Sequence, residues 1–456
     1  MTSYLRHSTR ADLTYSDSVW IYACTLIGHG LSMFLGGFIY RRLGLRPTVL
    51  LGSWTMSAGV MLTFFTVKHS FLGVVVTYGV VCGLGVGVAY SLPMSCAMKW
   101  LPERKGLAGG LVVAGFGGGG FIFNLVQTAF INPSNLSADL TVNNEKYFTQ
   151  PKVLERVPWV FVLTGGLYAV MQLVGVLLMT EPPQDSSDNS PDPRARARHD
   201  PETSPTANRV VNDETSLVST THPSIYAEIK ANAGVVSNAR PAADSGADEC
   251  INDVNESSAD LTPGQVLRSR HFYILWTCFL LNGQGVVFVL TLYKDYGQTF
   301  IKDDMFLAVT GAFAALFNCL GRLFWGFIGD RFSYNTAMAC LCSISTGVLI
   351  TFHATSLGGM AVYFIYVCVM FGTLAGNFAL FSLAGTAVFG QTHYPINYGF
   401  VFTSQAISAP VGAILASQLK TLIGWFGMFG LMAVCSFVSF LLTVIFKVET
   451  VRGERV

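Results

Sequence analysis

Eleven stretches of about 20 mainly apolar residues dominate the sequence, and that is the length a helix needs to cross the roughly 30 Å hydrocarbon core of a membrane. A water-soluble domain could not bury so many apolar faces. The chain is therefore predicted to be an all-α membrane protein. The spans are expected at residues 19–40, 48–67, 71–97, 106–130, 158–180, 272–293, 306–328, 336–355, 360–383, 398–419 and 426–447.

Composition supports this class and excludes others. Only 12% of the residues are charged and 51% are hydrophobic, whereas soluble domains carry about 25% charged residues. The net charge of +1 gives no basic field, so nucleic-acid binding is not expected. The ten cysteines lack metal-ligand spacing, and no set of nucleophile, base and orienting group is present. We therefore expect no enzyme activity, no metal and no cofactor.

A polar segment at residues 181–270 divides the chain. It contains runs such as PPQDSSDNSPDPRARARHDPE and is too poor in large apolar residues to fold compactly, so it is predicted to be a largely disordered linker. Before it lies an N-terminal half, 1–180, with five spans, and after it a C-terminal half, 271–456, with six. Near its end, Thr262 and Pro263 predict the start of a short helix. Basic residues near the span ends favour a linker and a C-terminus on the cytoplasmic side. The expected location is the plasma membrane.

Two turns in corresponding places of the halves are similar, GFIYRRLGLR after the first span and GFIGDRFSYN after the seventh. Similar turns indicate an internal repeat. Two such halves joined by a long linker resemble the major facilitator superfamily, whose turn motif is Gly, three residues, Asp, Arg, one residue, Gly and a basic residue. The second turn keeps Gly326, Asp330 and Arg331; the first keeps Gly37, Arg42, Gly44 and Arg46 but has Arg41 where the Asp belongs.

The resemblance implies a role for these turns. In the family, the acidic residue holds the inner gate by facing the positive N-terminal end of a helix, a contact worth a few tenths to about 1 kcal/mol when exposed. We therefore expect an intact gate contact at Asp330 and a weakened one at Arg41, where the charge is reversed.

The resemblance also implies six helices in each half, so five plus six leaves one absent. The start of the chain, MTSYLRHSTRADLTYSDSVWIY, resembles the outer loop between the first two helices of relatives, so helix 1 is expected to be the missing one. A truncated isoform, an incomplete gene model and a protein adapted to eleven spans are all compatible with this expectation.

Two further stretches narrow the family. GLGVGVAYSLPMSCAMKWLPERKGLAGGLVVAGFGGGG, at 83–120, resembles the helix 4 to helix 5 signature of the oxalate/formate antiporter and monocarboxylate transporter branch. INYGFVFTSQAISAPVG, at 396–412, is similar to helix 11 of that branch. The resemblance implies a secondary transporter of small organic anions, without specifying which anion.

Of all the Lys, Arg, Asp and Glu residues in the sequence, only Arg322 lies well inside a predicted span. A charge at the membrane centre costs at least about 2.5 to 3.5 kcal/mol on insertion scales, so it faces a cavity or a partner. Eight residues at 1.5 Å each place it about 12 Å from the inner end of its helix, near the depth at which transporters bind substrate. Its guanidinium fork matches a carboxylate, and Asn318 lies on the same helical face.

The resemblance aligns Arg322 with the anion-anchoring arginine of the branch; the alternative is a structural arginine that binds helix carbonyls. Where proton-coupled relatives have an Asp, this chain has Asn318, which cannot titrate. Relatives that handle dicarboxylates have a second cation, a lysine, at the position of Gln405. One fixed cation therefore favours a monocarboxylate over a dianion.

Three more side chains are candidates for the site. His29 lies about ten residues into its span, and it is either a packing residue or the carrier of a proton or a second positive charge, because its ordinary pKa is about 6.5. Tyr90 resembles a site tyrosine of helix 4, and Phe402 falls where relatives place a large aromatic residue in the cavity. Both are equally compatible with ordinary helix packing.

The sequence thus predicts a transporter of small organic anions, most simply monocarboxylates, that works by alternating access of its two halves. One alternative is a non-transporting homologue that acts as a sensor, a partner subunit or a dominant-negative isoform. Another is an oxalate/formate-type dicarboxylate exchanger. The expected partners are the anion and membrane lipid, and an accessory membrane protein is left open.

Overall fold

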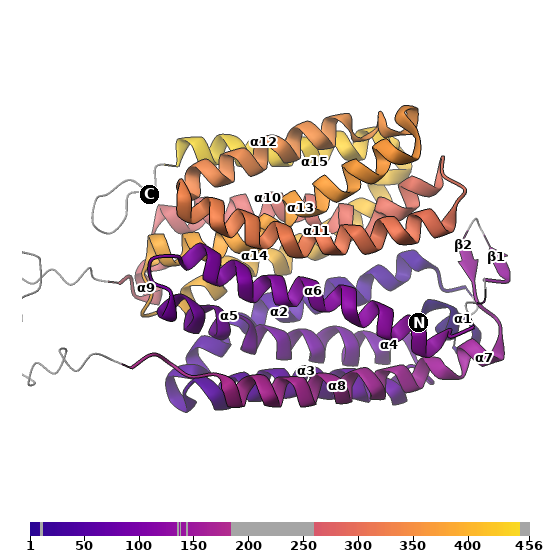
Figure 1. Ribbon diagram of the computed structural model, residues 1–456, viewed down its shortest axis with the longest axis horizontal. Coiled ribbons are helices and arrows are strands. Elements are labelled where there is room, and N and C mark those ends of the chain that lie inside the picture. Colours follow the sequence, from indigo (N-terminus) through magenta and orange to yellow (C-terminus); the bar gives the residue numbers. More distant parts are fainter. Residues whose placement is uncertain (10–11, 135, 137, 143–144, 184–259, 447–456) are drawn as a thin grey trace, which may run out of the picture. The chain divides into compact units, whose positions relative to one another are not determined.

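The computed structural model describes residues 1–9, 12–134, 136, 138–142, 145–183 and 260–446. The predicted disorder of the linker falls largely on residues 184–259 and so lies outside the described residues. What is described consists almost entirely of helices (Figure 1).

The N-terminal half contains long helices that begin and end close to the predicted spans. Three short elements lie at one end of them: α1 (Thr2–Ser8), the hairpin of β1 (Leu140–Val142) and β2 (Glu145–Tyr147), and α7 (Pro151–Leu154) (Figure 1). The two strands pair antiparallel. The long helices are α2 (Tyr15–Leu43), α3 (Leu45–Thr66), the continuous run of α4 (Phe71–Val74), π-helical η1 (Val75–Val81) and α5 (Cys82–Trp100), then α6 (Lys105–Ile131) and α8 (Arg156–Leu178).

Local chemistry explains where α2 begins and ends. At its start, the hydroxyl of Thr14 accepts a hydrogen bond from the Asp17 amide, and the Asp17 carboxylate accepts one from the Thr14 amide. These reciprocal bonds satisfy two amides that a helix start leaves unpaired. The helix ends at Gly44, whose φ of 82° is accessible to glycine at little cost.

In the C-terminal half, α9 is the short helix predicted from Thr262 and Pro263, and the Gln265 side chain accepts a hydrogen bond from the Thr262 amide there. The predicted break between spans near residues 356–359 corresponds to the break between α12 and α13 at residues 353–354, which is followed by a kink at Gly359, with φ of 71°. A second kink, at Gly424, begins the last apolar segment. The elements are α9 (Pro263–Val266), α10 (Arg270–Gln298), α11 (Asp304–Arg331), α12 (Tyr334–Phe352), α13 (Thr355–Phe389), α14 (Tyr394–Ile414), π-helical η4 (Leu415–Leu419) and α15 (Lys420–Ile445).

Within the described residues, ten helices are long and apolar enough to cross a membrane. The prediction of an all-α membrane protein is confirmed, while the count of eleven spans stays a prediction. The predicted span that is not among these ten helices is α14, which carries four buried polar side chains: Asn397, Ser404, Gln405 and Ser408. Its polar side chains face protein rather than lipid, which is the arrangement that intramembrane polar groups require.

The halves meet mainly through two pairs of helices, α2 with α14 and α6 with α11. Glycines allow these backbones to approach closely. A Cβ atom at Gly37 would lie 2.8 Å from the Ile396 amide nitrogen, and one at Gly326 would collide with the Gly106 carbonyl. We call the end of the bundle where α8 ends and α9 begins the linker side (Figure 1). The starts of α6 and α14 lie on it.

Candidate functional site

Arg322 lies on α11 and is buried, with 6% of its surface exposed. Its Nε donates a hydrogen bond to the Asn318 side-chain oxygen at 3.2 Å, as the spacing of four residues predicts. Its Nη1 donates to the carbonyl of Val113, on α6, at 2.9 Å. The bond to a helix carbonyl is the contact expected of a structural arginine, while the role of anchoring an anion stays a prediction. An arginine has five N–H groups, and these bonds use two of them.

Aromatic side chains from five helices link into a closed loop of contacts that begins and ends at Arg322. The guanidinium carbon lies 5.9 Å from the centre of one ring of the loop and 4.9 Å from the centre of another, distances at which a cation is attracted to an aromatic face. We call this set the aromatic cluster: Phe116 of α6, Tyr90 of α5, His29 of α2, Phe402 of α14 and Phe378 of α13.

The structure brings three of the predicted residues into this cluster. The His29 ring lies 4.7 Å from the Tyr90 ring and 4.4 Å from the Phe402 ring, centre to centre. The Nε2 atom of His29 is buried and has no hydrogen-bond partner among the described residues. The hydroxyl of Tyr398, whose ring contacts Phe402, is also buried and has no hydrogen-bond partner among the described residues. A buried polar atom without a partner costs about 1 to 3 kcal/mol, so two such atoms beside one site are candidates for contact with a ligand.

Gln405 makes a hydrogen bond to a neighbouring helix of its own half. It is buried, and its amide nitrogen donates to the Phe279 carbonyl of α10 at 2.8 Å, so the side chain is turned toward α10. Among the described residues, Arg322 is the one buried Lys, Arg, Asp or Glu side chain. A single buried cation therefore faces the aromatic cluster.

The turn after α11 makes the contact expected of it. The two carboxylate oxygens of Asp330 accept hydrogen bonds from the Gly106 amide at 2.7 Å and the Leu107 amide at 2.6 Å. Both amides belong to the first turn of α6, where backbone N–H groups lack helical partners and the helix dipole is positive. Asp330 thus fastens α11 to α6 on the linker side. Arg331, the last residue of α11, is exposed.

The turn after α2 occupies the corresponding position in its half, but its side chains make different contacts. Gly37 packs against Ile396 in the first turn of α14, as Gly326 packs against α6. Arg41 and Arg42 are exposed. Arg46 donates from Nε to the Met179 carbonyl at 2.8 Å, so this motif residue binds the end of the first half.

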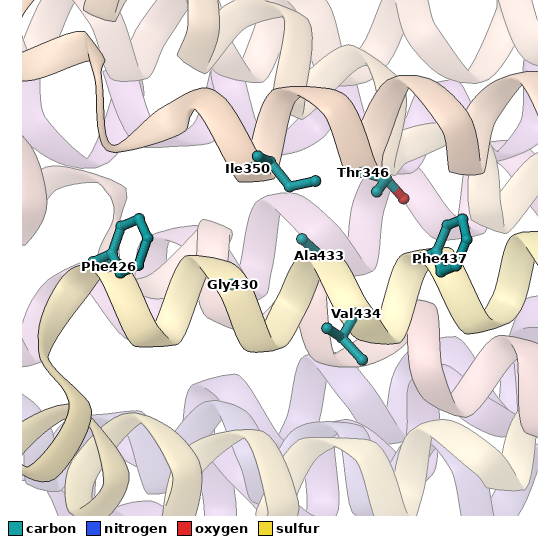
Figure 2. A pocket seen from close by; sticks show the side chains of 7 residues that line it. All are labelled: Thr346, Ile350, Phe426, Gly430, Ala433, Val434 and Phe437. Carbon is teal, nitrogen blue, oxygen red and sulfur yellow. The ribbon is translucent and has the colours of Figure 1, made fainter.

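An apolar hollow of about 550 Å³ lies elsewhere, between α12 and α15 (Figure 2). Thr346 and Ile350 line it from α12, and Phe426, Ala433 and Phe437 are among the residues that line it from α15. It contains no charged side chain, so it offers nothing that would recognise an anion.

Sequence reasoning missed several parts of the site. Phe116, Phe378 and the Val113 carbonyl contact Arg322 from two other helices, and nothing in their local sequence marks them. Tyr398 stood within the stretch that resembles helix 11, one turn before Phe402, and that spacing was the available signal.

The fold and the site define a transporter of two helical halves with a buried cation between them. The family model of the Major Facilitator Superfamily matches residues 5–407, so the chain belongs to this superfamily, whose members are transporters and not enzymes. The predicted branch, similar to oxalate/formate antiporters and monocarboxylate transporters, is confirmed.

Individual relatives agree with this assignment. The chain is 29% identical to apicoplast pyruvate carrier 1 of Toxoplasma gondii over 92% of its own length and 73% of that protein. It is 22% identical to the oxalate:formate antiporter of Oxalobacter formigenes over 89% of its length and 77% of that protein. The solved structure of the E. coli fucose:proton symporter superimposes with a TM-score of 0.59 at 12% identity, covering 97% of this chain and 93% of that one, which shows the shared fold.

Proposed function

We propose that the protein is a secondary transporter that carries small monocarboxylates across a membrane by alternating access of its two halves. The observation that carries the proposal is Arg322: a permanently charged guanidinium, buried in an aromatic cluster, with hydrogen bonds from two of its five N–H groups. A single carboxylate would neutralise it and satisfy further N–H groups.

The residues around Arg322 support an anion with one charge and a small body. Asn318 is neutral and Gln405 is turned toward α10, so a second carboxylate would find no second cation there. A buried charge without a partner is strongly destabilising, which disfavours a dianion such as oxalate. The similarity to a pyruvate carrier supports the same substrate class, and the similarity to an oxalate:formate antiporter makes oxalate the natural competitor.

We further propose that the linker side faces the cytoplasm, on the distribution of basic residues near the helix ends. The plasma membrane is the expected location. The Asp330 contact would then close the inner gate in the conformation described here.

Uptake into proteoliposomes tests the function. Radiolabelled pyruvate, formate and oxalate are offered to the full chain, and we expect saturable uptake of the monocarboxylates with oxalate as the weakest substrate. Arg322→Lys keeps the charge but loses the bidentate fork, so uptake should fall at least about tenfold, the loss that a charge-assisted hydrogen bond of about 1.5 kcal/mol predicts.

Arg270→Lys is the matched control, because Arg270 is an exposed arginine at the start of α10, outside the site and the gate turns, and should tolerate the change. Parental uptake in Arg322→Lys, or a preference for oxalate, would contradict the proposal. An absence of uptake for every anion, in a chain that remains folded, would favour the non-transporting alternative.

A further inference from the structure

The two halves close on the linker side through equivalent pairs of elements. In one pair, Gly326 allows α11 to approach the start of α6, and Asp330, four residues later, binds two amides of that start. In the other, Gly37 allows α2 to approach the start of α14, and the residue four positions later is Arg41. A cation cannot replace a carboxylate in binding the positive end of a helix, so the residue of α2 at this position does not supply the contact that Asp330 makes in the first pair.

A carboxylate is nevertheless present at the start of α14, and it comes from the end of the linker. An oxygen of Asp260 accepts a hydrogen bond of 2.5 Å from the amide of Thr392, two residues before α14 begins. The next residue, Leu261, donates its amide to the Phe389 carbonyl at 3.1 Å, and its own carbonyl accepts from the Asn397 side chain at 3.0 Å. Three hydrogen bonds therefore fasten the linker end to the connection between α13 and α14.

Gly390 provides the place for this carboxylate. Its φ is 82°, in the region that glycine adopts at little cost, and a Cβ atom at this position would collide with the carboxylate of Asp260. The turn and the carboxylate therefore fit one another, and a side chain at residue 390 would separate them.

We propose that Asp260 is the gate carboxylate of the second helix pair, supplied by the linker in place of the residue that Arg41 replaces. It is a positioning residue: it acts on α14, which packs against α2 and carries Phe402 of the aromatic cluster. The linker end thereby stabilises the linker-side-closed conformation. The meaning of this conformation for transport rests on the proposed function, but the contact itself does not.

Labelling of an introduced cysteine tests the inference without any substrate. Ser382 of α13 is fully buried, and a Cβ atom at Gly109 of α6 would lie 3.0 Å from its hydroxyl, so Ser382→Cys becomes accessible when the halves separate on the linker side. The full chain carrying Ser382→Cys reacts with a polyethylene-glycol maleimide in detergent. The same chain without this substitution gives the background from the natural cysteines.

Asp260→Ala should increase the labelling rate about twofold to fivefold, the range expected from a carboxylate at a helix start. Asp260→Asn keeps the shape and an acceptor oxygen but removes the charge, and it should also increase the rate. Adding Arg41→Asp to Asp260→Ala should restore the parental rate, because a carboxylate then stands where the other half has Asp330. Asp303→Ala removes a carboxylate cap at the far end of α11 and should leave the rate unchanged.

The inference is wrong if Asp260→Ala or Asp260→Asn labels at the parental rate, or if the double variant labels as fast as Asp260→Ala. If Asp260 only caps its own turn, the double variant should label as fast as Asp260→Ala, because Arg41→Asp could not replace such a cap. The outcome is separable from the proposed function because the labelling needs no substrate: a chain that transports none of the anions can still show the gate response.

Discussion

Arg322 connects the two halves as well as offering a charge to a ligand. It belongs to α11, yet one of its nitrogens binds the Val113 carbonyl of α6 in the other half. Any separation of the halves on the linker side must break or carry along this bond. An anion that binds other N–H groups of the same guanidinium acts on the group that makes this bond, which gives the site a direct physical link between occupancy and the contact of the halves.

His29 provides the second test at the scale of one residue. His29→Phe keeps an aromatic ring beside Tyr90 and Phe402 but removes the buried Nε2 atom. If Nε2 binds the anion, the KM for pyruvate should rise several-fold while thermal stability is kept or increased, since an unpartnered polar atom disappears. Uptake is measured over substrate concentration, with the melting temperature of the purified protein as the stability measure.

A substitution of His29 also tests whether transport is coupled to protons. His29→Gln retains a polar group that cannot titrate, so uptake that loses its dependence on pH between about 5.5 and 7.5 would assign proton coupling to His29. Uptake with an unchanged pH profile would remove it from that role, and an unchanged KM in His29→Phe would make it a packing residue.

Gln405 is expected to set the charge of the substrate. Gln405→Lys supplies a second buried cation on α14, at the cost of the bond to the Phe279 carbonyl. We expect oxalate uptake to rise relative to pyruvate by about tenfold or more, because the dianion gains a charge-assisted partner. Competition between the two labelled anions measures the ratio. Gln405→Met, which is neutral and of similar size, is the control, and a ratio that is the same in both variants would separate Gln405 from substrate choice.

At the scale of elements, the contact of α6 with α11 depends on glycine. A Cβ atom at Gly326 would meet the Gly106 carbonyl, so Gly326→Ala should force the helices apart. Overpacking of this kind costs about 1 to 3 kcal/mol, and the melting temperature should fall by several degrees. Gly120→Ala on α6 is the matched control, because a Cβ there has open space. Equal melting temperatures for the two variants would show that the close approach is not required.

The sequence was sufficient for the helices and insufficient for their breaks. Apolar length predicted nearly every long helix, since membrane crossing demands it. The break between α12 and α13 lies at residues 353–354, a few residues before the predicted one, and the kink at Gly359 follows it, because a glycine with positive φ and a loop leave similar local signals. The start of α14 was placed four residues late, since its buried polar side chains lower its hydropathy.

In the site, too, the sequence predicted some contacts and not others. The pair of Asn318 and Arg322 followed from helical spacing, because residues four apart share a face. Phe116 and Phe378 did not follow, since their contact with Arg322 is a product of packing between helices far apart in the chain. The bond of Gln405 to the Phe279 carbonyl did not follow for the same reason: the position of Gln405 was known, but its partner on α10 was not.

At the scale of the whole molecule, each described end of the linker is fastened to a turn on the linker side. The first end follows α8, where Arg46 binds the Met179 carbonyl and the Trp100 side chain donates to the Thr180 carbonyl at 2.8 Å. The second end is Asp260 with Leu261. The linker therefore begins at the gate turn of α2 and ends at the start of α14, the two elements whose closure lacks a carboxylate of its own.

Glu181 completes the first attachment, and its ionisation makes that attachment dependent on pH. Tyr40 donates a hydrogen bond of 2.5 Å to its carboxylate, and Lys99 lies 3.1 Å away. The pKa of the Glu181 carboxyl is therefore held below its ordinary value, mainly by the Tyr40 bond. Because the folded pKa is the lower one, the attachment stabilises the protein above about pH 4.3, the ordinary pKa, and is lost as pH falls through the folded pKa.

Glu181→Gln should accordingly lower the melting temperature slightly at pH 7, and the difference from the parent should shrink as pH falls through the folded pKa of Glu181. The effect is small because the pair is partly exposed to solvent. Glu155 is an exposed glutamate just before the other end of α8, and Glu155→Gln should behave like the parent over the same pH range. A difference between Glu181→Gln and the parent that does not shrink as pH falls would mean that the side chain acts through packing rather than through its charge.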